Sequence, residues 1–164
     1  MSLARASRPA VLALALVLAA CGASTGSPSS DAEESQAFTA RNNATISMAS
    51  PVEESAVLER GEPAADPDHE GLTRYEFTAD GAGFSFAISL DPATPMSGSQ
   101  ESSDALVLAF TVGDSTFVST AAECAVTFVN YSDAVIDGEI DCADVPADGT
   151  DDLAEATGIF AFAP

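Results

Sequence analysis

Lysine and tryptophan are absent from this 164-residue chain, and its five arginines face 26 acidic residues, which gives a formal net charge of −21 at pH 7. A nucleic-acid-binding protein neutralises phosphates with clustered lysine and arginine, so this balance excludes one. It also argues against docking by charge on anionic lipid headgroups. With no tryptophan and two tyrosines, the aromatic platform usual in sugar-binding sites is thin.

Histidine occurs once, as His69 between Asp68 and Glu70. A histidine among carboxylates can bind a divalent metal. One imidazole in a polar loop is more often solvated, and we expect that here. The sequence has no G-x-S-x-G segment to mark a nucleophilic serine that His69 would activate. We therefore expect no enzyme and no bound cofactor.

Apolar runs long enough to cross a bilayer are also missing from the amino-terminal region. Arg5 and Arg8 lead into an uncharged run, PAVLALALVLAA, over residues 9–20. As a helix it would be about 18 Å long, against a hydrocarbon core of about 30 Å. Residues 1–20 therefore have the pattern of a helical secretory signal peptide.

The end of that run, Leu18, Ala19, Ala20 and Cys21, resembles the lipobox of bacterial lipoprotein precursors. The resemblance implies cleavage before Cys21, a diacylglycerol on its sulfur, and an anchor on the outer face of the bacterial cell membrane. Two or three acyl chains hold a protein stably because each buried methylene contributes about 0.8 kcal/mol. The alternative is an ordinary secretory signal, which would leave an odd exposed thiol.

Composition divides the rest of the chain into two parts. Residues 21–36 carry the acylated cysteine and a Gly, Ser, Thr, Pro, Asp and Glu segment, which predicts a flexible tether. Residues 37–164 form the predicted domain, which a long loop at 59–71 interrupts.

Alternating apolar residues throughout the predicted domain indicate β-strands. We predict hairpins of 75–79 with 84–90 and of 105–112 with 115–120, outer strands at 44–50 and 55–59, and a last strand containing Phe160 and Phe162. A Gly113-Asp114 turn suits the second hairpin because glycine adopts positive φ. The expected fold is all-β: an antiparallel sandwich of seven to eight short strands, with an immunoglobulin-like arrangement as one form.

Two of the three cysteines occupy neighbouring predicted strands. A turn centred on Asp133 gives the opposed pairs Cys124–Cys142, Val126–Ile140 and Phe128–Gly138. Directly opposed residues lie within disulfide range. We therefore predict a structural Cys124–Cys142 disulfide, which fits an exported protein, with Phe128 over Gly138.

The acidic segment 144–155 is the strongest metal candidate. On the calcium-loop template, Gly149 takes the sixth position, and the ligands would be Asp144, Asp148, Asp152 and Glu155. Pro146 at the third position has no side-chain oxygen, and the flanks are strand-like rather than helical. The alternatives are an acidic inter-strand loop and weak calcium binding.

Beyond the lipobox, the chain resembles small actinobacterial surface lipoproteins, being alanine-rich, lysine-free and β-rich with one predicted disulfide. We expect a lipid-anchored binding or interaction module whose partner is an unidentified protein, a carbohydrate or cations. The alternatives are a secreted hydrolase and a passive envelope component with weak calcium binding.

Overall fold

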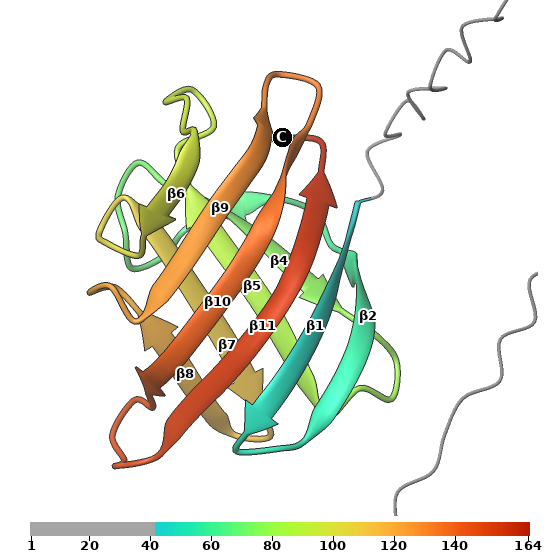
Figure 1. Cartoon of the computed structure of the whole chain (residues 1–164), viewed down its shortest axis with the longest axis vertical. Helices are drawn as coiled ribbons and strands as arrows, with labels where there is room; N and C mark the ends of the chain where they lie inside the picture. Colours follow the sequence, from blue (N-terminus) through green and yellow to red (C-terminus); the bar gives the residue numbers. More distant parts are fainter. Residues whose placement is uncertain (1–41) are drawn as a thin grey trace, which may run out of the picture. The chain divides into compact units, whose positions relative to one another are not determined.

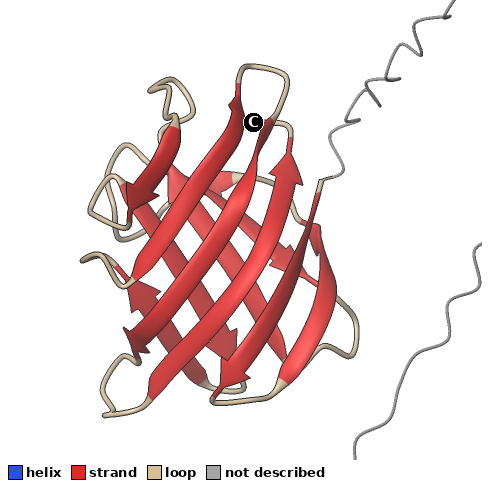
Figure 2. Ribbon diagram, in the orientation of Figure 1, coloured by secondary structure: helices blue, strands red, loops and turns tan. Residues whose placement is uncertain are grey.

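The computed structural model describes residues 42–164, which form β-strands joined by turns and loops (Figures 1 and 2). The strands are β1 (Asn43–Ser50), β2 (Glu54–Arg60), β3 (Ala64–Ala65), β4 (Thr73–Thr78), β5 (Phe84–Leu90), β6 (Gly98–Glu101), β7 (Leu106–Val112), β8 (Ser115–Ser119), β9 (Cys124–Tyr131), β10 (Ile136–Pro146) and β11 (Leu153–Phe162). Within these residues we find no helix with the length and apolar character needed to cross a membrane.

All strands belong to one antiparallel sheet with the order β6-β9-β10-β11-β1-β2-β4-β5-β7-β8, and β3 pairs with β4. The sheet curls into a half-barrel, so that a front layer of β6, β9, β10, β11, β1 and β2 crosses a rear layer of β4, β5, β7 and β8 (Figure 1). The predicted all-β, antiparallel fold is confirmed. The predicted sandwich of seven to eight strands is not confirmed, because one sheet of eleven strands supplies both layers.

The predicted hairpins are present, as β4 with β5 and β7 with β8. Gly113 has φ 58°, the positive value that the turn between β7 and β8 was expected to need. The prediction that 44–50 and 55–59 are outer strands is wrong, since β1 lies between β2 and β11 in the middle of the sheet. Its pairing with β11 joins residues far apart in sequence, such as Asn43 and Ala161, and no local pattern reveals such a pairing.

The hairpin of β9 and β10 has the predicted register, with Cys124 opposite Cys142 and joined to it by a disulfide. Gly138 is opposite Phe128, also as predicted. The ring nearest to Gly138 is nevertheless that of Phe160, 3.1 Å from where a Cβ would lie. Such a Cβ would also be 2.4 Å from the Thr127 carbonyl oxygen, so the close packing of these strands requires glycine.

Aromatic side chains join the two layers inside the fold. Phe162 on β11 packs against two rings of the rear layer, with centroid distances of 4.4 Å to Tyr75 and 5.8 Å to Phe77. The series continues along the rear layer from Phe77 to Phe86 at 5.5 Å and on to Phe110 at 5.4 Å. All five side chains are at most 1% exposed. Phe162 therefore fastens the front layer to the rear layer.

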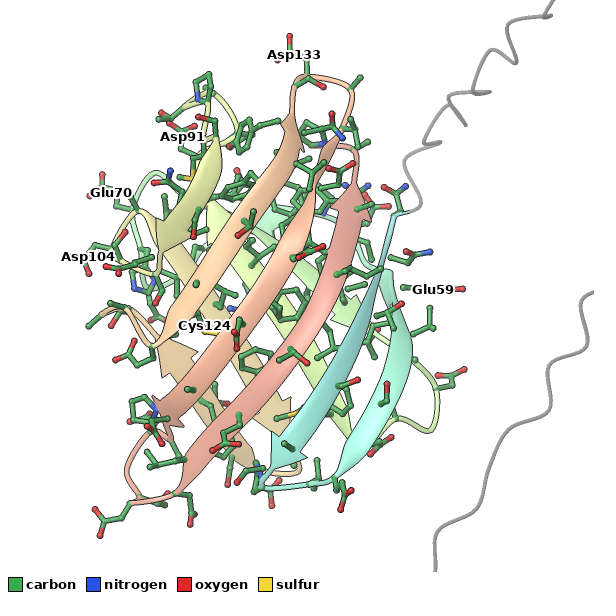
Figure 3. All side chains as sticks on the ribbon, in the orientation of Figure 1. Glu59, Glu70, Asp91, Asp104, Cys124 and Asp133 are labelled. Atoms are coloured by element: carbon green, nitrogen blue, oxygen red, sulfur yellow. A yellow bond between two sulfur atoms is a disulfide. The ribbon has the colours of Figure 1, made fainter. Side chains whose placement is uncertain are left out.

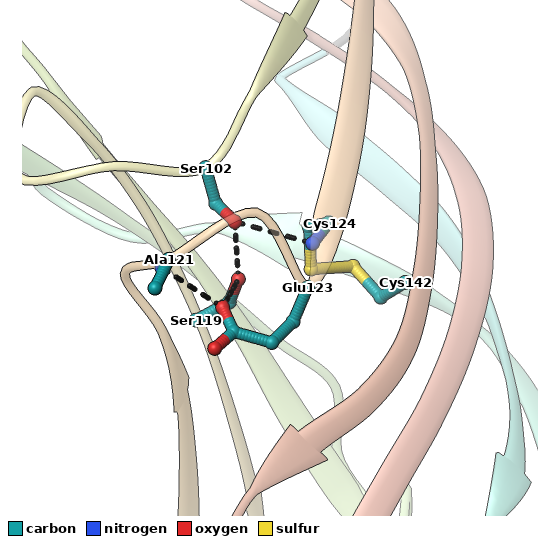
Figure 4. The surroundings of a disulfide bond; sticks show 6 residues. All are labelled: Ser102, Ser119, Ala121, Glu123, Cys124 and Cys142. Carbon is teal, nitrogen blue, oxygen red and sulfur yellow. Dashed lines mark hydrogen bonds between the residues drawn. A yellow bond between two sulfur atoms is a disulfide. The ribbon is translucent and has the colours of Figure 1, made fainter.

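A hydrogen-bond network joins the two end strands of the sheet beside the disulfide (Figure 4). Ser119 ends β8 and Ser102 follows β6, and their hydroxyls are 2.5 Å apart. The Ser119 hydroxyl donates to Glu123 at 2.9 Å, and the Cys124 N–H donates to Ser102 at 3.1 Å. Because a carboxylate only accepts and Ser119 has one proton, Ser102 donates to Ser119. The network thus connects the two edges of the sheet, next to the disulfide that joins β9 to β10.

We predict that Phe162→Ala lowers the free energy of unfolding by about 3 to 5 kcal/mol, because it removes the ring that joins the layers and leaves a cavity. Ile159→Ala, on the same strand but 55% exposed, should cost less than about 1 kcal/mol. Urea unfolding of both variants provides the measurement. Equal losses for the two would show that the layers do not depend on this contact.

Candidate functional site

Three of the four large aliphatic side chains that the described residues expose gather on the outer face of the front layer, and the fourth, Leu153, lies apart from them at the start of β11. Val57 on β2, Val129 on β9 and Ile159 on β11 are 59%, 68% and 55% exposed. Their strand neighbours Leu58 and Phe160 are buried, so the alternation that fills the core directs these three outward. The exposure of Val129 has a further cause. The register shift opposite Asp137 and Gly138 leaves Val129 without a paired residue on β10.

These aliphatic side chains line a groove of about 430 Å³. Five neighbouring strands contribute to it, in the order β2, β1, β11, β10 and β9. At about 4.8 Å per strand it is roughly 19 Å long. Residues that pair across neighbouring strands form two rows along the groove. The first row is Val57, Thr45, Ile159 and Glu139, and the second is Asn43, Ala161, Asp137 and Asn130. The groove is therefore long, shallow and mostly apolar.

Asp137 forms the buried polar end of this groove and is 5% exposed. Its carboxylate accepts hydrogen bonds from the Asn130 backbone N–H at 2.8 Å and from the Asn130 side-chain amide at 3.0 and 2.9 Å. Within residues 42–164, the hydrogen bonds to Asp137 come from neutral donors, and no cationic side chain forms an ion pair with it.

The groove has acidic surroundings, and none of its lining residues within the described range 42–164 is positively charged. Glu139 lines it together with Asp137, and Asp141 occupies the next outward position of β10. Arg60, at the end of β2, turns away from it: its guanidinium donates to the Ala163 carbonyl oxygen and lies 6.0 Å from the centre of the Tyr75 ring. Labelled acidic side chains also project outward around the rest of the domain (Figure 3). The local field therefore favours positively charged ligands.

Three carboxyl groups with a lowered pKa lie outside the groove. Hydrogen bonds from the Thr94 hydroxyl and the Ala93 N–H lower the pKa of Asp91. Burial acts to raise the pKa of Glu123, but hydrogen bonds from backbone N–H groups and from Ser119 together lower it. Both carboxylates organise turns, so their shifted pKa values have a structural cause.

The third such carboxyl group, Asp66, lies at the centre of a cluster with the single histidine. Asp66 accepts hydrogen bonds from the Ser89 hydroxyl at 2.5 Å and from the backbone N–H groups of Asp68 and His69, and its carboxylate is 3.0 Å from His69 Nδ1. The imidazole is thus partnered rather than simply solvated. A hydrolytic triad needs the histidine between serine and carboxylate, whereas here the carboxylate is in the middle and Ser89 is 1% exposed.

The predicted calcium ligands are not gathered by the fold. Strand β10 runs to Pro146 and β11 starts at Leu153, so Asp144 and Glu155 lie in strands and the connecting turn is short. Within residues 42–164, no group of three or more His, Cys, Asp or Glu side chains is arranged to hold a metal ion. Asp148 and Asp152 remain in the turn, where Thr150 donates to Asp152 at 3.0 Å. The segment 144–155 is thus a turn between two strands with Asp144 and Glu155 on its flanks, and weak calcium binding there stays a prediction.

The predicted signal peptide (1–20), the tether (21–36) and the lipidated Cys21 lie outside the described residues. The sequence analysis missed the groove, since its strands come from both ends of the domain. One signal was available: the outward positions of these strands carry Val57 and Ile159 where charged residues are usual.

Comparison with known proteins adds no relative: no family model, curated protein or solved structure matches this chain.

Asp66 predicts a pH dependence of stability. Burial acts to raise its pKa, but the hydrogen bonds from Ser89, Asp68 and His69 outweigh this and lower it from 3.8 to about 2. A carboxyl whose pKa is lower in the folded state stabilises the protein above its unfolded pKa, here by about 2 kcal/mol. We expect that stabilisation to disappear as the pH falls from about 4 to about 2.

The test is urea unfolding of Asp66→Asn and wild type across this pH range. The variant should be less stable at pH 7, and the difference should narrow toward pH 2. Asp68→Asn, which changes the exposed carboxylate nearby, is the matched control. A difference between wild type and Asp66→Asn that does not vary with pH would contradict this account.

Proposed function

We propose that this protein is a binding module, anchored by a lipid on Cys21 to the outer face of the bacterial cell membrane, that takes its ligand in the groove of the front layer. The observation that carries the binding role is the groove: exposed Val57 and Ile159 lie beside Asn43, Thr45 and Glu139 on ordered strands. Concave sites that mix apolar surface with a few placed polar groups are typical of ligand binding.

A hydrolase is the less favoured function. The groove lining that the described residues form contains neither histidine nor serine. The cluster of Asp66, His69 and Ser89 has the wrong order for activating a nucleophile. A passive envelope component is also less favoured. It would have no need of exposed aliphatic side chains gathered in one groove, since isolated ones are usual on protein surfaces.

The proposed anchor is compatible with the composition of the chain, because an acylated protein needs no positive surface charge to stay at a membrane. A chain with a net charge of −21 is repelled by anionic headgroups, whereas two or three acyl chains hold a protein whatever its charge. The thiol of Cys21, at the end of the signal-like run, is the proposed attachment point.

We expect the full chain, expressed in a bacterial host, to incorporate a labelled fatty acid and to fractionate with membranes. Cys21→Ser should lose the label and leave the membrane fraction. Cys124→Ser with Cys142→Ser is the control, because it removes the other two cysteines and should keep the label. Labelling that persists in Cys21→Ser would contradict the anchor.

The location of binding is tested by NMR titration of the full chain with a panel of short peptides, oligosaccharides and fatty acids. We expect a binding ligand to shift the amide resonances of groove residues, such as Thr45, Glu139 and Ile159, more than those of the rear layer. Shifts concentrated on β7 and β8 would place binding elsewhere and contradict the groove as the site.

A further inference from the structure

We propose that the groove of the front layer binds an extended, positively charged peptide segment of another protein. This inference rests on the proposed function and names its partner class. It combines three properties of the groove: its length, its apolar floor and the sign of the charge along it.

The length of the groove favours an extended chain. A span of roughly 19 Å over five strands accommodates about six residues of extended polypeptide. A volume of about 430 Å³ spread over that length leaves a shallow channel rather than a deep pocket. A peptide crossing the strands cannot join the backbone ladder, which the sheet itself uses. The side chains of Asn43 and Thr45 can donate to and accept from its backbone instead.

The charge of the groove selects a basic partner. Asp137 and Glu139 line it, Asp141 follows on the same strand, and among residues 42–164 no positive residue lines it. Lysine and arginine suit such a site because their aliphatic stems pack on apolar side chains such as Val57 and Ile159, while their charged ends reach carboxylates. Charge complementarity of this kind mainly raises the rate and specificity of association.

The negative charge of the groove also disfavours two other occupants, a second copy of the chain and the predicted tether. A second copy of the chain would bring another −21 toward the groove. The predicted tether is also unsuitable, because residues 21–36 contain Asp31, Glu33 and Glu34 and no lysine or arginine. We therefore take the partner to be a segment of a different protein, with displacement by the chain's own residues 37–41 excluded if their deletion leaves binding of the valine-lysine peptide unchanged.

The test uses the full chain and fluorescently labelled hexapeptides, with binding followed by fluorescence anisotropy at low and at high sodium chloride. One peptide alternates valine with lysine, a second alternates valine with glutamate, and a third alternates glycine with lysine. We expect the valine-lysine peptide to bind at least about 10-fold more tightly than either of the others at low salt, and to weaken as salt screens the charges.

Variants locate the site. Val57→Ser combined with Ile159→Ser should weaken binding of the valine-lysine peptide about 10-fold by removing the apolar floor. Glu139→Gln should weaken it about 3-fold, mainly at low salt. Leu153→Ser and Glu70→Gln are the matched controls, since they change an exposed aliphatic and an exposed acidic residue outside the groove, and both should bind as wild type does.

Each contrary result overturns the proposal. Equal binding of the valine-glutamate peptide would remove the charge argument, and spermine that binds as tightly as the valine-lysine peptide would make the ligand a small cation. Peptide-independent dimers in sedimentation would make the occupant a second copy. If an oligosaccharide or fatty acid binds and the double variant loses that binding, the result supports the binding module and contradicts the basic peptide as its ligand. If the groove variants change the binding of no probe, the result contradicts both the proposed binding module and the basic peptide.

Discussion

The packing of the Phe162 ring against Tyr75 and Phe77 is the contact on which the two layers depend. It lies at the carboxyl end of β11, a strand that pairs with β1 on one side and β10 on the other. Because side chains alternate along a strand, β11 directs Phe160 and Phe162 into the core and Ile159 into the groove. The same strand therefore holds the fold together and contributes the floor of the proposed binding site.

A second constraint is the shortage of cations among many acids. Where the fold buries or orients a carboxylate, it uses hydroxyl and amide donors, namely Ser89 at Asp66, Ser119 at Glu123 and the Asn130 amide at Asp137, and only Asp66 also contacts a histidine among the described residues. Such hydrogen bonds stabilise the charged form but do not neutralise it. The negative charge of the groove consequently stays available to an external partner. This is the physical link between the composition of the chain and the basic peptide that we propose.

Local patterns in the sequence predicted the hairpins well. The register of β9 and β10, including the Cys124–Cys142 disulfide, followed from one assumed turn and the period of two along a strand. The Gly113 turn followed from the conformational freedom of glycine. In contrast, ligand spacing in the acidic segment 144–155 did not indicate how far the neighbouring strands extend, and Asp144 and Glu155 lie in β10 and β11.

The sequence by itself determined the strand-rich fold, the charge and the pairing of strands adjacent in the chain, because each of these depends on composition or on contacts across a short turn. Only the tertiary structure decided that β1 pairs with β11, that one sheet forms both layers, and that Val57, Ile159 and Glu139 line one groove. These features depend on contacts between residues about a hundred positions apart. Many pairings of amphipathic strands bury the same apolar faces, so alternation alone does not select among them.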